Sequence, residues 1–524
     1  MKPTSDFIYE YHDRTKHHPH RYAASLGYMD WATQPDPFRS FEGADRVMLP
    51  LPEIEDAPAY GDLFKALPAQ PITRDTLSVL LRYSLGLAAI KCMGSDCWAL
   101  RCNASSGNLH PTEGYVVLPP IAGISERSVV AHYAPKAHAL EILHRFDTDF
   151  WEKLPAGAFI FGITSIPWRE AWKYGERAFR YTQLDAGHAI RSVQVAARLT
   201  GWYGRLIDAQ EPEAVDAILG LDQPERFKTL EPEIADALLL ITPDADTPLP
   251  DLAGLVQACR APFDGRANLL SPAHHDWEAV TLAERATHAE AQPLPVVPHR
   301  TFENGSTDGT QALILKRRSA RAMDFGRTRI GLDAFLQLIG SATVAFEPFE
   351  HAVSLVIFVH DVETLEPGLY LYLLNETFLQ TFRQKMRGDF LFRNAAENLY
   401  LLEAGDFRQQ AKFISCSQDI AADGTFSLGM LCEFAPQLER FGPQRYKSLY
   451  WECGAIGQQL YLEATALGLS ATGIGCFLDD VMHRLLGLDG HDFQSLYHFT
   501  IGRAIPDVRL QTRAPYADRT VSNL

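Results

Sequence analysis

Two short stretches of the sequence have side chains suited to a ligand that is both charged and flat. The first, residues 316–321, reads KRRSAR and presents Arg317, Arg318, Ser319 and Arg321 close together. Guanidinium groups bind phosphate oxygens through paired hydrogen bonds, and a serine hydroxyl adds a further donor. This stretch therefore predicts a phosphate-binding site, although a basic run taken alone is more typical of a solvated surface.

Small side chains dominate the second stretch, residues 103–108, which reads NASSGN. Alanine, serine and glycine let a flat ring system approach the backbone closely. Taken alone, such a loop is more typical of a turn. The residues in and beside this stretch that we predict to contact a ligand are Arg101, Ala104, Ser105, Ser106, Gly107 and Asn108.

A third candidate element is residues 472–477, TGIGCF. Its Gly-x-Gly pattern would expose backbone N–H groups to a ligand, and such a pattern is a weak signal by itself. The residues that we predict to contribute are Gly473, Ile474, Gly475 and Cys476.

The composition indicates a globular protein that does not bind nucleic acid. The chain has 524 residues, of which 46% are hydrophobic and 22% are charged, and such values are ordinary for a soluble protein. Its net charge of −17 would repel a polyphosphate. The sequence contains no apolar run of about 18 residues that would predict a membrane span, and residues 1–22 lack the features of a secretory signal. We therefore expect a cytoplasmic protein.

The cysteines and histidines do not show the spacing of a metal site. Cys92, Cys97 and Cys102 follow one another at intervals of five residues, which fits neither a zinc site nor a redox pair. We therefore expect reduced thiols. The histidines in residues 17–20 are expected to lie in a solvated loop, because no cysteine or acidic residue stands at ligand spacing from them. No metal ion is predicted.

Two long segments resemble each other and indicate an internal duplication. Residues 174–202 read YGERAFRYTQLDAGHAIRSVQVAARLTGW, and residues 441–470 read FGPQRYKSLYWECGAIGQQLYLEATALGLS. Both have the apolar spacing of a long, buried helix with a glycine after its end. Aligned without gaps, they match at Gly175 and Gly442, Asp185 and Glu452, Gly187 and Gly454, Ala197 and Ala464, and Gly201 and Gly468.

Matching runs on both sides extend the repeat. GYVVL and LVIFV read as strands that precede the long segments, and DALLLIT and LYHFTIG read as strands that follow them. We therefore predict an α+β chain built from two copies of one unit. The predicted boundaries are an N-terminal extension at 1–57 that wraps the surface, a first domain at 58–245, a linker at 246–308 and a second domain at 309–524.

The two copies keep different candidate elements. Where the second copy has KRRSAR, the first has KALPAQ, residues 65–70, without arginine. Where the first copy has NASSGN, the second has the bulky, acidic TVAFEPFE, residues 343–350. One complete set of elements is therefore expected, with the loop from the first copy and the arginine cluster from the second.

This combination resembles the nitroreductase family of flavin enzymes and, within it, the azoline-dehydrogenase (SagB-type) branch. ASSGN is similar to the family's Pro-Ser-Ser-x-Asn loop with Ala104 in place of proline, and RRSAR is similar to its phosphate cluster. The resemblance implies a tandem duplication of the nitroreductase-like fold, with an antiparallel or mixed sheet flanked by helices. Family members bind FMN at a homodimer interface, so this chain is expected to form a pseudo-dimer that holds one FMN.

The resemblance also implies roles for single residues. GIGCF stands where the family has the backbone N–H that faces flavin N5, so Gly475 or Cys476 is the expected donor. A basic residue near the C-terminus reaches the phosphate in the family. Arg513 fits that position best, and Arg509 is the second candidate.

Candidate bases follow from the Lys-Tyr pair of azoline dehydrogenases, which precedes the buried helix. The second copy has Tyr446 and Lys447 in reversed order, and the first has Arg180 and Tyr181. Lys447, Tyr446 and Tyr181 are therefore candidate catalytic residues, with surface ion pairs as the alternative role. His110 and His188 are expected to be structural.

The predicted function is that of an FMN-dependent oxidoreductase of nitroreductase type that transfers hydride through flavin N5. NAD(P)H is the candidate co-substrate and a small molecule the substrate. One alternative is a SagB-type dehydrogenase that oxidises azoline rings of peptides with oxygen as acceptor. An alternative of another class is a non-catalytic flavin-binding or scaffold protein. The chain is expected to be a monomeric pseudo-dimer or a homodimer of pseudo-dimers.

Overall fold

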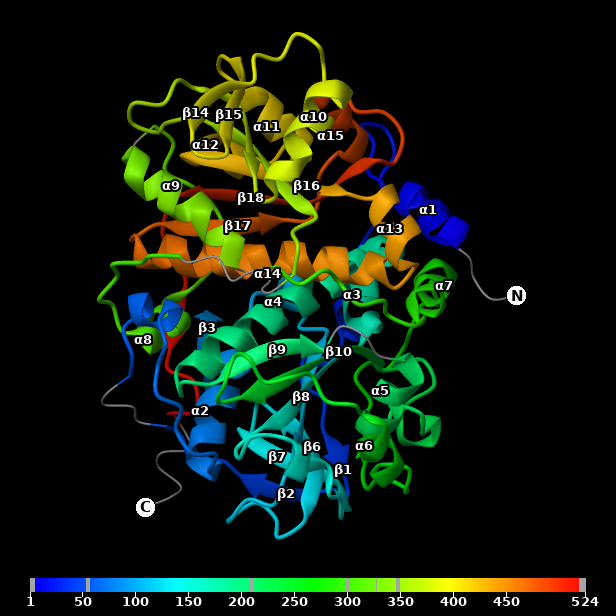
Figure 1. Ribbon diagram of the computed structural model, residues 1–524. Helices are drawn as coiled ribbons and strands as arrows, with labels where there is room; N and C mark the ends of the chain where they lie inside the picture. Colours follow the sequence, from blue (N-terminus) through cyan, green and yellow to red (C-terminus); the bar gives the residue numbers. More distant parts are fainter. Residues whose placement is uncertain are drawn as a thin grey trace.

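The structure is a computed structural model that describes residues 5–52, 57–207, 211–297, 302–326, 328–344 and 349–517. Two seven-stranded sheets, one from each half of the chain, lie on either side of a pair of long helices (Figure 1). Each sheet is antiparallel throughout and is flanked by helices. The α+β fold with an internal duplication is therefore confirmed.

The first sheet has the strand order β2-β7-β6-β5-β8-β10-β9. Its central strand, predicted from GYVVL, is buried on both faces, which explains its nearly continuous apolar sequence. The strands are β2 (Asp45–Met48), β5 (Thr112–Leu118), β6 (Ser128–Ala134), β7 (Ala139–Phe146), β8 (Phe159–Ser165), β9 (Tyr203–Ile207) and β10 (Ile234–Thr242).

The second sheet repeats this order as β14-β15-β13-β12-β16-β18-β17. Six strands of this sheet, in the order β15-β13-β12-β16-β18-β17, correspond one by one to β7-β6-β5-β8-β10-β9 of the first sheet. The strands are β12 (Val353–Val359), β13 (Gly368–Leu373), β14 (Arg393–Ala396), β15 (Leu399–Ala404), β16 (Phe426–Glu433), β17 (Ser470–Ile474) and β18 (Phe493–Gly502).

The two long helices are α4 (Ala178–Arg198) and α14 (Arg445–Ala466), and they come from the segments that resemble each other. They run side by side in the same direction, between the two sheets (Figure 1). Near their beginnings the rings of Phe179 and Tyr446 are stacked, and further along Nε of Arg191 donates to Oε1 of Gln459 at 3.0 Å. This arrangement brings the two copies together along the whole length of both helices.

Two glycines allow the helices to approach each other. A Cβ atom on Gly454 would lie 2.1 Å from the carbonyl oxygen of Leu184, and one on Gly187 would lie 2.3 Å from that of Trp451. Such distances are far shorter than any ordinary contact, so only glycine fits at both positions. The sequence alignment pairs these same two glycines, which therefore meet where the copies touch.

A second signature of the repeat is the sequence LGLD, which closes one helix in each copy. α5 (Pro212–Leu219) is capped by Gly220 and α15 (Asp479–Leu486) by Gly487. Both glycines adopt a left-handed conformation, with φ of 69° and 72°, in which the chain leaves a helix without a steric cost.

The two chain ends cross to the opposite copy. In α1 (Ser5–Arg14), Nε2 of His12 lies 3.0 Å from Oε1 of Gln494 in the second sheet. Ile8, Tyr11 and His12 are fully buried, so the N-terminal segment packs against the rest of the chain through these side chains. At the other end, β19 (Gln511–Arg513) pairs with β3 (Leu87–Met93) of the first copy.

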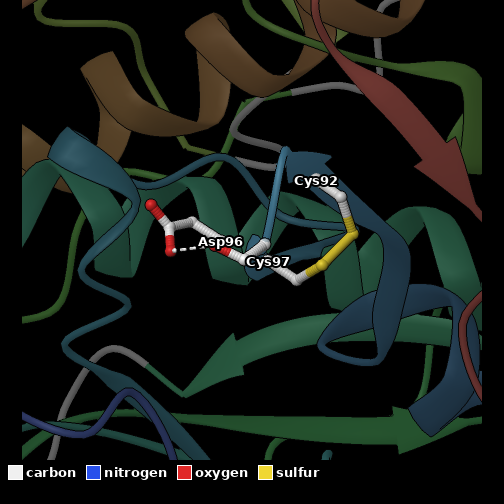
Figure 2. The surroundings of a disulfide bond; sticks show 4 residues. Cys92, Asp96 and Cys97 are labelled. Carbon is white, nitrogen blue, oxygen red and sulfur yellow. Dashed lines mark hydrogen bonds between the residues drawn. A yellow bond between two sulfur atoms is a disulfide. The ribbon is translucent and has the colours of Figure 1, made fainter.

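A disulfide closes the hairpin of β3 and β4 (Asp96–Arg101), where Cys92 and Cys97 are paired across the two strands (Figure 2). The expectation of reduced thiols is therefore wrong for these two cysteines. The interval of five residues, with Gly94 and Ser95 at the turn, brings both Cα atoms to 4.1 Å from each other.

The remaining elements cover the sheets and connect the copies. In the predicted linker, β11 (Arg266–Ala267) pairs with β1 (Phe41–Glu42). Of the helices in the described residues, none is sufficiently long and apolar to span a membrane. The other helices are α2 (Arg74–Ser84), α3 (Pro167–Tyr174), α6 (Ala253–Ala258), α7 (Glu278–Thr287), α8 (Thr310–Lys316), α9 (Leu332–Ser341), α10 (Leu379–Lys385), α11 (Arg408–Ile414), α12 (Ile420–Asp423) and α13 (Ala435–Phe441).

Candidate functional site

Arg317 joins the two copies at the predicted site. It caps the C-terminal end of α8, where the helix gives way to an extended segment. Its Nε donates to the carbonyl oxygen of Cys102 at 3.1 Å, and its Nη2 donates to that of Arg101 at 3.1 Å. The arginine stretch of the second copy thus lies against the small-residue loop of the first, across 215 positions of sequence.

Arg318 and Lys91 form a basic cluster next to this contact. Burial and the neighbouring Arg317 lower the pKa of Arg318 to about 10. Burial and Arg318 likewise lower the pKa of Lys91, which donates to the hydroxyl of Thr512 at 2.6 Å. Among the described residues, no carboxylate shifts the pKa of Arg317 or of Arg318. Cations gathered in this way favour the binding of an anion.

Asp185 of α4 holds the small-residue loop in place through hydrogen bonds. The backbone N–H of Ser106 donates to both carboxylate oxygens at 3.0 Å, and its hydroxyl donates to Oδ1 at 2.9 Å. Burial raises the pKa of Asp185 to about 7, although the hydrogen bonds from Ser105 and Ser106 oppose this shift. Gly107 is exposed, with φ of 58°, so the loop turns sharply at the solvent edge of the cluster.

The second copy uses the aligned position in the same way. Glu452, which corresponds to Asp185, accepts a hydrogen bond from the backbone N–H of Ala352 at 3.2 Å and lies 3.0 Å from Nδ1 of His351. Of the segment TVAFEPFE, residues 345–348 lie outside the described residues.

Gln458 of α14 connects the loop to the interior of the site. Its Oε1 accepts a hydrogen bond from the backbone N–H of Ala104 at 3.2 Å and one from Nδ1 of His188 at 3.1 Å. Nε2 of His188 then accepts from the hydroxyl of Tyr497 at 3.1 Å. Burial lowers the pKa of His188 to about 3, so this histidine stays neutral and orients Tyr497.

Tyr461 of α14 connects the arginine stretch to the Gly-x-Gly turn. Its hydroxyl lies 2.7 Å from Oγ of Ser319 and accepts a hydrogen bond from the backbone N–H of Gly473 at 2.9 Å. The backbone of Ala320 also donates to the carbonyl of Ala471 at 3.1 Å. The cluster is therefore continuous from the arginines to the turn after β17.

The turn after β17 leaves Gly475 as a backbone donor. No described residue accepts a hydrogen bond from its N–H, whereas its carbonyl accepts from Nη2 of Arg177 at 3.2 Å. A Cβ atom on Gly475 would lie 2.0 Å from the ring of Tyr181, and one on Gly473 would lie 1.8 Å from the hydroxyl oxygen of Tyr497. Both glycines are thus required by close aromatic neighbours. Ile474 is buried between them and Cys476 is half-buried.

The side chains of four other predicted arginines do not join Arg318 in the basic cluster. The guanidinium of Arg101 is fully buried, donates to the carbonyl of Thr112 and lies 3.8 Å from Glu113, so only its own carbonyl faces Arg317. Arg321 and Arg509 are exposed and lie near Asp507, at 3.7 Å and 2.8 Å. Arg513 is exposed on β19. The predicted residue Asn108 stabilises the loop itself, because its side chain donates to the carbonyl of Ala99 at 3.0 Å.

The three candidate bases lie in different places. Only Tyr181 borders the cluster, through its ring against Gly475. Tyr446 is buried at the beginning of α14, with its hydroxyl 3.3 Å from His12. Lys447 donates to the carbonyl of Ala235 at 2.7 Å and pairs with Asp236 at 3.1 Å. The structure therefore does not bring Tyr446 and Lys447 to the cluster, because buried partners hold their side chains elsewhere.

At the corresponding position in the other half of the molecule, the residues of the cluster are replaced by others. A small pocket there is lined by residues that include Leu206, Ile207, Phe441, Ser448 and Trp451. By the alignment of the copies, Leu206 replaces Gly473 and Ser448 replaces Tyr181. Further replacements are Gln194 for Tyr461, Arg191 for Gln458 and Ala455 for His188.

Sequence reasoning missed five residues of the cluster: Lys91, Asp185 as the support of the loop, Gln458, Tyr461 and Tyr497. The comparison of the copies contained a signal for two of them. Gln458 and Tyr461 stand opposite Arg191 and Gln194 on otherwise similar helices, so a polar difference marks the side of the helix pair that bears the site.

Of the histidines near the N-terminus, His17 differs from expectation, whereas His20 is exposed. His17 is buried rather than solvated, and its backbone N–H donates to Asp479 at 3.0 Å. The part of the chain that the structure describes contains no group of three or more His, Cys, Asp and Glu side chains arranged for a metal ion.

Comparison with known proteins shows where this architecture has been seen. The model of the nitroreductase family matches residues 65–230 and 314–503. A solved structure of a candidate nitroreductase from Anabaena variabilis is 23% identical, covers 95% of this chain and 99% of its own, and has a TM-score of 0.68. Its length shows that the paired arrangement of both copies occurs in another protein.

Two further solved structures match less than half of this chain. A candidate nitroreductase from Ralstonia eutropha is 15% identical over 41% of this chain and 99% of its own, with a TM-score of 0.28. A chain of the microcin synthetase McbBCD complex of E. coli, solved with truncated pro-MccB17 bound, is 17% identical over 46% of this chain and 93% of its own, also with a TM-score of 0.28. A search of curated proteins gave no match.

Proposed function

This chain belongs to the nitroreductase family, and we propose that it is an FMN-dependent oxidoreductase with one composite flavin site per chain. One observation carries this proposal. Arg317 of the second copy is hydrogen-bonded to the backbone of the first copy's loop at Cys102, beside cations that have no carboxylate partner among the described residues. The related stretches of the other half, residues 65–70 and 343–350, contain neither the arginine run nor the small-residue loop.

The residues present suit the two ends of FMN. Its phosphate carries about two negative charges and needs several donors, which Arg318, Lys91 and Ser319 would supply. Arg317 would act mainly on the loop, because its guanidinium is engaged by the carbonyls of residues 101 and 102. The isoalloxazine ring is flat and would lie over the small side chains of residues 104–107.

The reacting atom of the flavin would be oriented by the turn after β17. When bound, FMN supplies a hydride acceptor and donor at N5. The N–H of Gly475 would donate a hydrogen bond at that atom, because it has no acceptor among the described residues. Tyr181 would shield this position from water, since its ring covers Gly475.

The reaction that we favour is reduction of a small molecule with electrons from NAD(P)H. A dehydrogenase that oxidises azoline rings with oxygen would need a base near N5. Of the three candidates, only Tyr181 lies at the cluster, and it is a tyrosine whose pKa is raised by burial. A tyrosine with a raised pKa stays protonated at neutral pH and cannot accept the proton, and this consideration favours the reductase. The paired copies form the site within one chain, so a second chain is not needed to complete it.

The test is reduction of the purified, FMN-loaded protein without oxygen. We expect NADH or NADPH to bleach the flavin absorbance, and a nitroaromatic or quinone to restore it. Bleaching by an azoline-containing peptide instead would favour the dehydrogenase. Failure of every hydride donor to bleach a fully loaded protein would overturn the enzymatic proposal and favour a scaffold. As a structural control, Ser105→Trp would fill the space above the loop and should prevent loading without unfolding the chain.

A further inference from the structure

Two cysteines, far apart in sequence, lie side by side at the edge of the turn after β17. The Sγ atoms of Cys416 and Cys476 are 2.8 Å apart, and both residues are half-buried. A disulfide bond has a length of about 2.05 Å. The two sulfur atoms therefore need to approach each other by only about 0.8 Å to become bonded. Two thiol groups at this distance can convert between a reduced form without a bond and an oxidised form with a disulfide bond.

The two turns that carry these cysteines are tied to each other. The backbone N–H of Leu478 donates to the carbonyl of Ile414 at 2.7 Å, and Nε2 of Gln418 donates to the carbonyl of Cys476 at 3.2 Å. Cys416 and Ser417 have positive φ angles of 53° and 60°. Such angles are uncommon for residues with a side chain and show that the segment bends sharply at these two positions.

His17 supplies a donor to one of the two sulfur atoms. Its Nδ1 accepts a hydrogen bond from the backbone N–H of Ala23 at 3.0 Å, so the proton of the neutral ring is on Nε2. The histidine side chain is hydrogen-bonded to Cys476, and Arg177 adds a positive charge nearby. The Cys416 thiol and His17 stabilise a thiolate on Cys476. Arg177 lowers the pKa of both cysteines, and Tyr22 is hydrogen-bonded to Cys416.

We propose that Cys416 and Cys476 form a redox-active dithiol, in which Cys476 attacks low-molecular-weight disulfides and Cys416 closes the internal bond. In the first step the Cys476 thiolate bonds to one sulfur of the disulfide, and the other sulfur leaves as a thiolate that takes a proton from water. In the second step Cys416 loses its proton to water and attacks the Cys476 sulfur, which releases the second thiolate. The protein loses two electrons, and the small disulfide becomes two thiols.

The asymmetry between the two sulfurs supports this order of attack. The hydrogen bond between the two thiols, followed by the contacts with His17 and Arg177, lowers the pKa of Cys476 to about 5, although burial opposes the shift. The same contact with Cys476 raises the pKa of Cys416. At neutral pH the nucleophilic thiolate is therefore on Cys476.

The chain contains a matched pair that should not react. Sγ of Cys432 lies 3.5 Å from that of Cys453, but both residues are fully buried and burial raises the pKa of Cys432. A second internal reference is the Cys92–Cys97 disulfide, which is expected to be present before and after oxidation. The inference does not depend on the bound flavin, so it can be tested on protein with and without FMN.

The test is treatment of the folded protein with oxidised glutathione, followed by intact mass and peptide mapping. We expect wild type to lose two hydrogen atoms through a new Cys416–Cys476 bond, and Cys416→Ser to retain one glutathione on Cys476. Cys476→Ser should take up no glutathione on Cys416. Bonding of Cys432 to Cys453, or an unmodified Cys416→Ser variant, would overturn the proposal.

A measurement on unmodified wild type keeps the proposal testable if a variant does not fold. The rate of alkylation by iodoacetamide should identify Cys476 as the fastest thiol at about pH 6, well below the pKa of about 8.5 for a free cysteine. Alkylation of Cys476 no faster than that of the buried pair at this pH would contradict the inference.

Discussion

The guanidinium of Arg317 donates to the carbonyl oxygen of Cys102 at 3.1 Å, and the two residues belong to different copies of the repeat. This contact fixes the arginine stretch of one copy against the loop of the other. In a homodimer the same contact would occur twice. Here the chain has kept it on one side only, since residues 65–70 in the first copy have no arginine.

Loss of Arg318 should weaken the binding of FMN. In Arg318→Ala one guanidinium is removed from a cluster that has no carboxylate among the described residues, and a hydrogen bond to a charged group contributes about 1.5–3 kcal/mol. The Kd for FMN, measured by quenching of flavin fluorescence, should rise by about tenfold to a hundredfold. Arg127→Ala, which removes a surface partner of Asp147, is the control. An equal Kd for both variants would argue against a phosphate site at Arg318.

A methyl group at Gly454 should destabilise the contact between the copies. The Cβ atom of Gly454→Ala would lie 2.1 Å from the carbonyl oxygen of Leu184, so α4 and α14 must separate, and such overpacking costs about 1–3 kcal/mol. Urea unfolding should show a lower midpoint. Gly254→Ala is the matched control, because a Cβ there meets nothing within 4 Å. Equal midpoints would mean that the helices do not cross at this glycine.

Asp185 should make stability depend on pH in the acid range. Its pKa is about 7 in the folded chain because of burial and about 3.9 when unfolded. Between these values the folded chain binds a proton that the unfolded chain has released, so stability falls as the pH rises from about 4 to about 7. Asp185→Asn does not titrate. Its free energy of unfolding, relative to wild type, should therefore increase over this window by up to about 1.4 kcal/mol per pKa unit.

The check on Asp185 is a series of urea titrations at several pH values. Asp147→Asn, which changes an exposed carboxylate, controls for the loss of a charge. A difference between Asp185→Asn and wild type that stays constant from about pH 4 to about pH 7 would show that Asp185 has an ordinary pKa.

Lys447 should be needed for stability and not for the flavin. Its ammonium group is buried and pairs with Asp236 at 3.1 Å, so Lys447→Met leaves that carboxylate without its cation. Removing one partner of a buried pair costs about 3–5 kcal/mol. The free energy of unfolding should fall by about this amount, while the folded fraction binds FMN with the Kd of wild type. A loss of flavin binding greater than the loss of folded protein would show that Lys447 takes part in the flavin site.

The fold could be predicted from the sequence because the duplication is visible in residues that packing cannot exchange. Gly187 and Gly454 are aligned and in contact, and Gly220 and Gly487 end equivalent helices. The buried position of His12 could not be predicted, since it depends on Gln494 of the second sheet. A local pattern such as that of residues 5–14 carries no information about a partner so distant in sequence.

The candidate site could be predicted in part. The arginine stretch and the loop stand out in the sequence because each is present in only one of the two copies. The pairing of Lys447 with Asp236 depends on the position of β10 and was not visible in the sequence. The Cys92–Cys97 bond, in contrast, had a local signal, because Gly94 and Ser95 favour a hairpin turn that brings both cysteines opposite each other.

The measurement that tests the composite site most directly is the number of FMN molecules per chain. The protein is saturated with FMN, freed of excess ligand and denatured with acid, and the released flavin is compared with the protein concentration. One site formed by both copies predicts a ratio of one. A ratio of two would show that the half with Leu206 and Ser448 also binds flavin, and a ratio of zero would show that the arginine cluster and the loop do not form a flavin site.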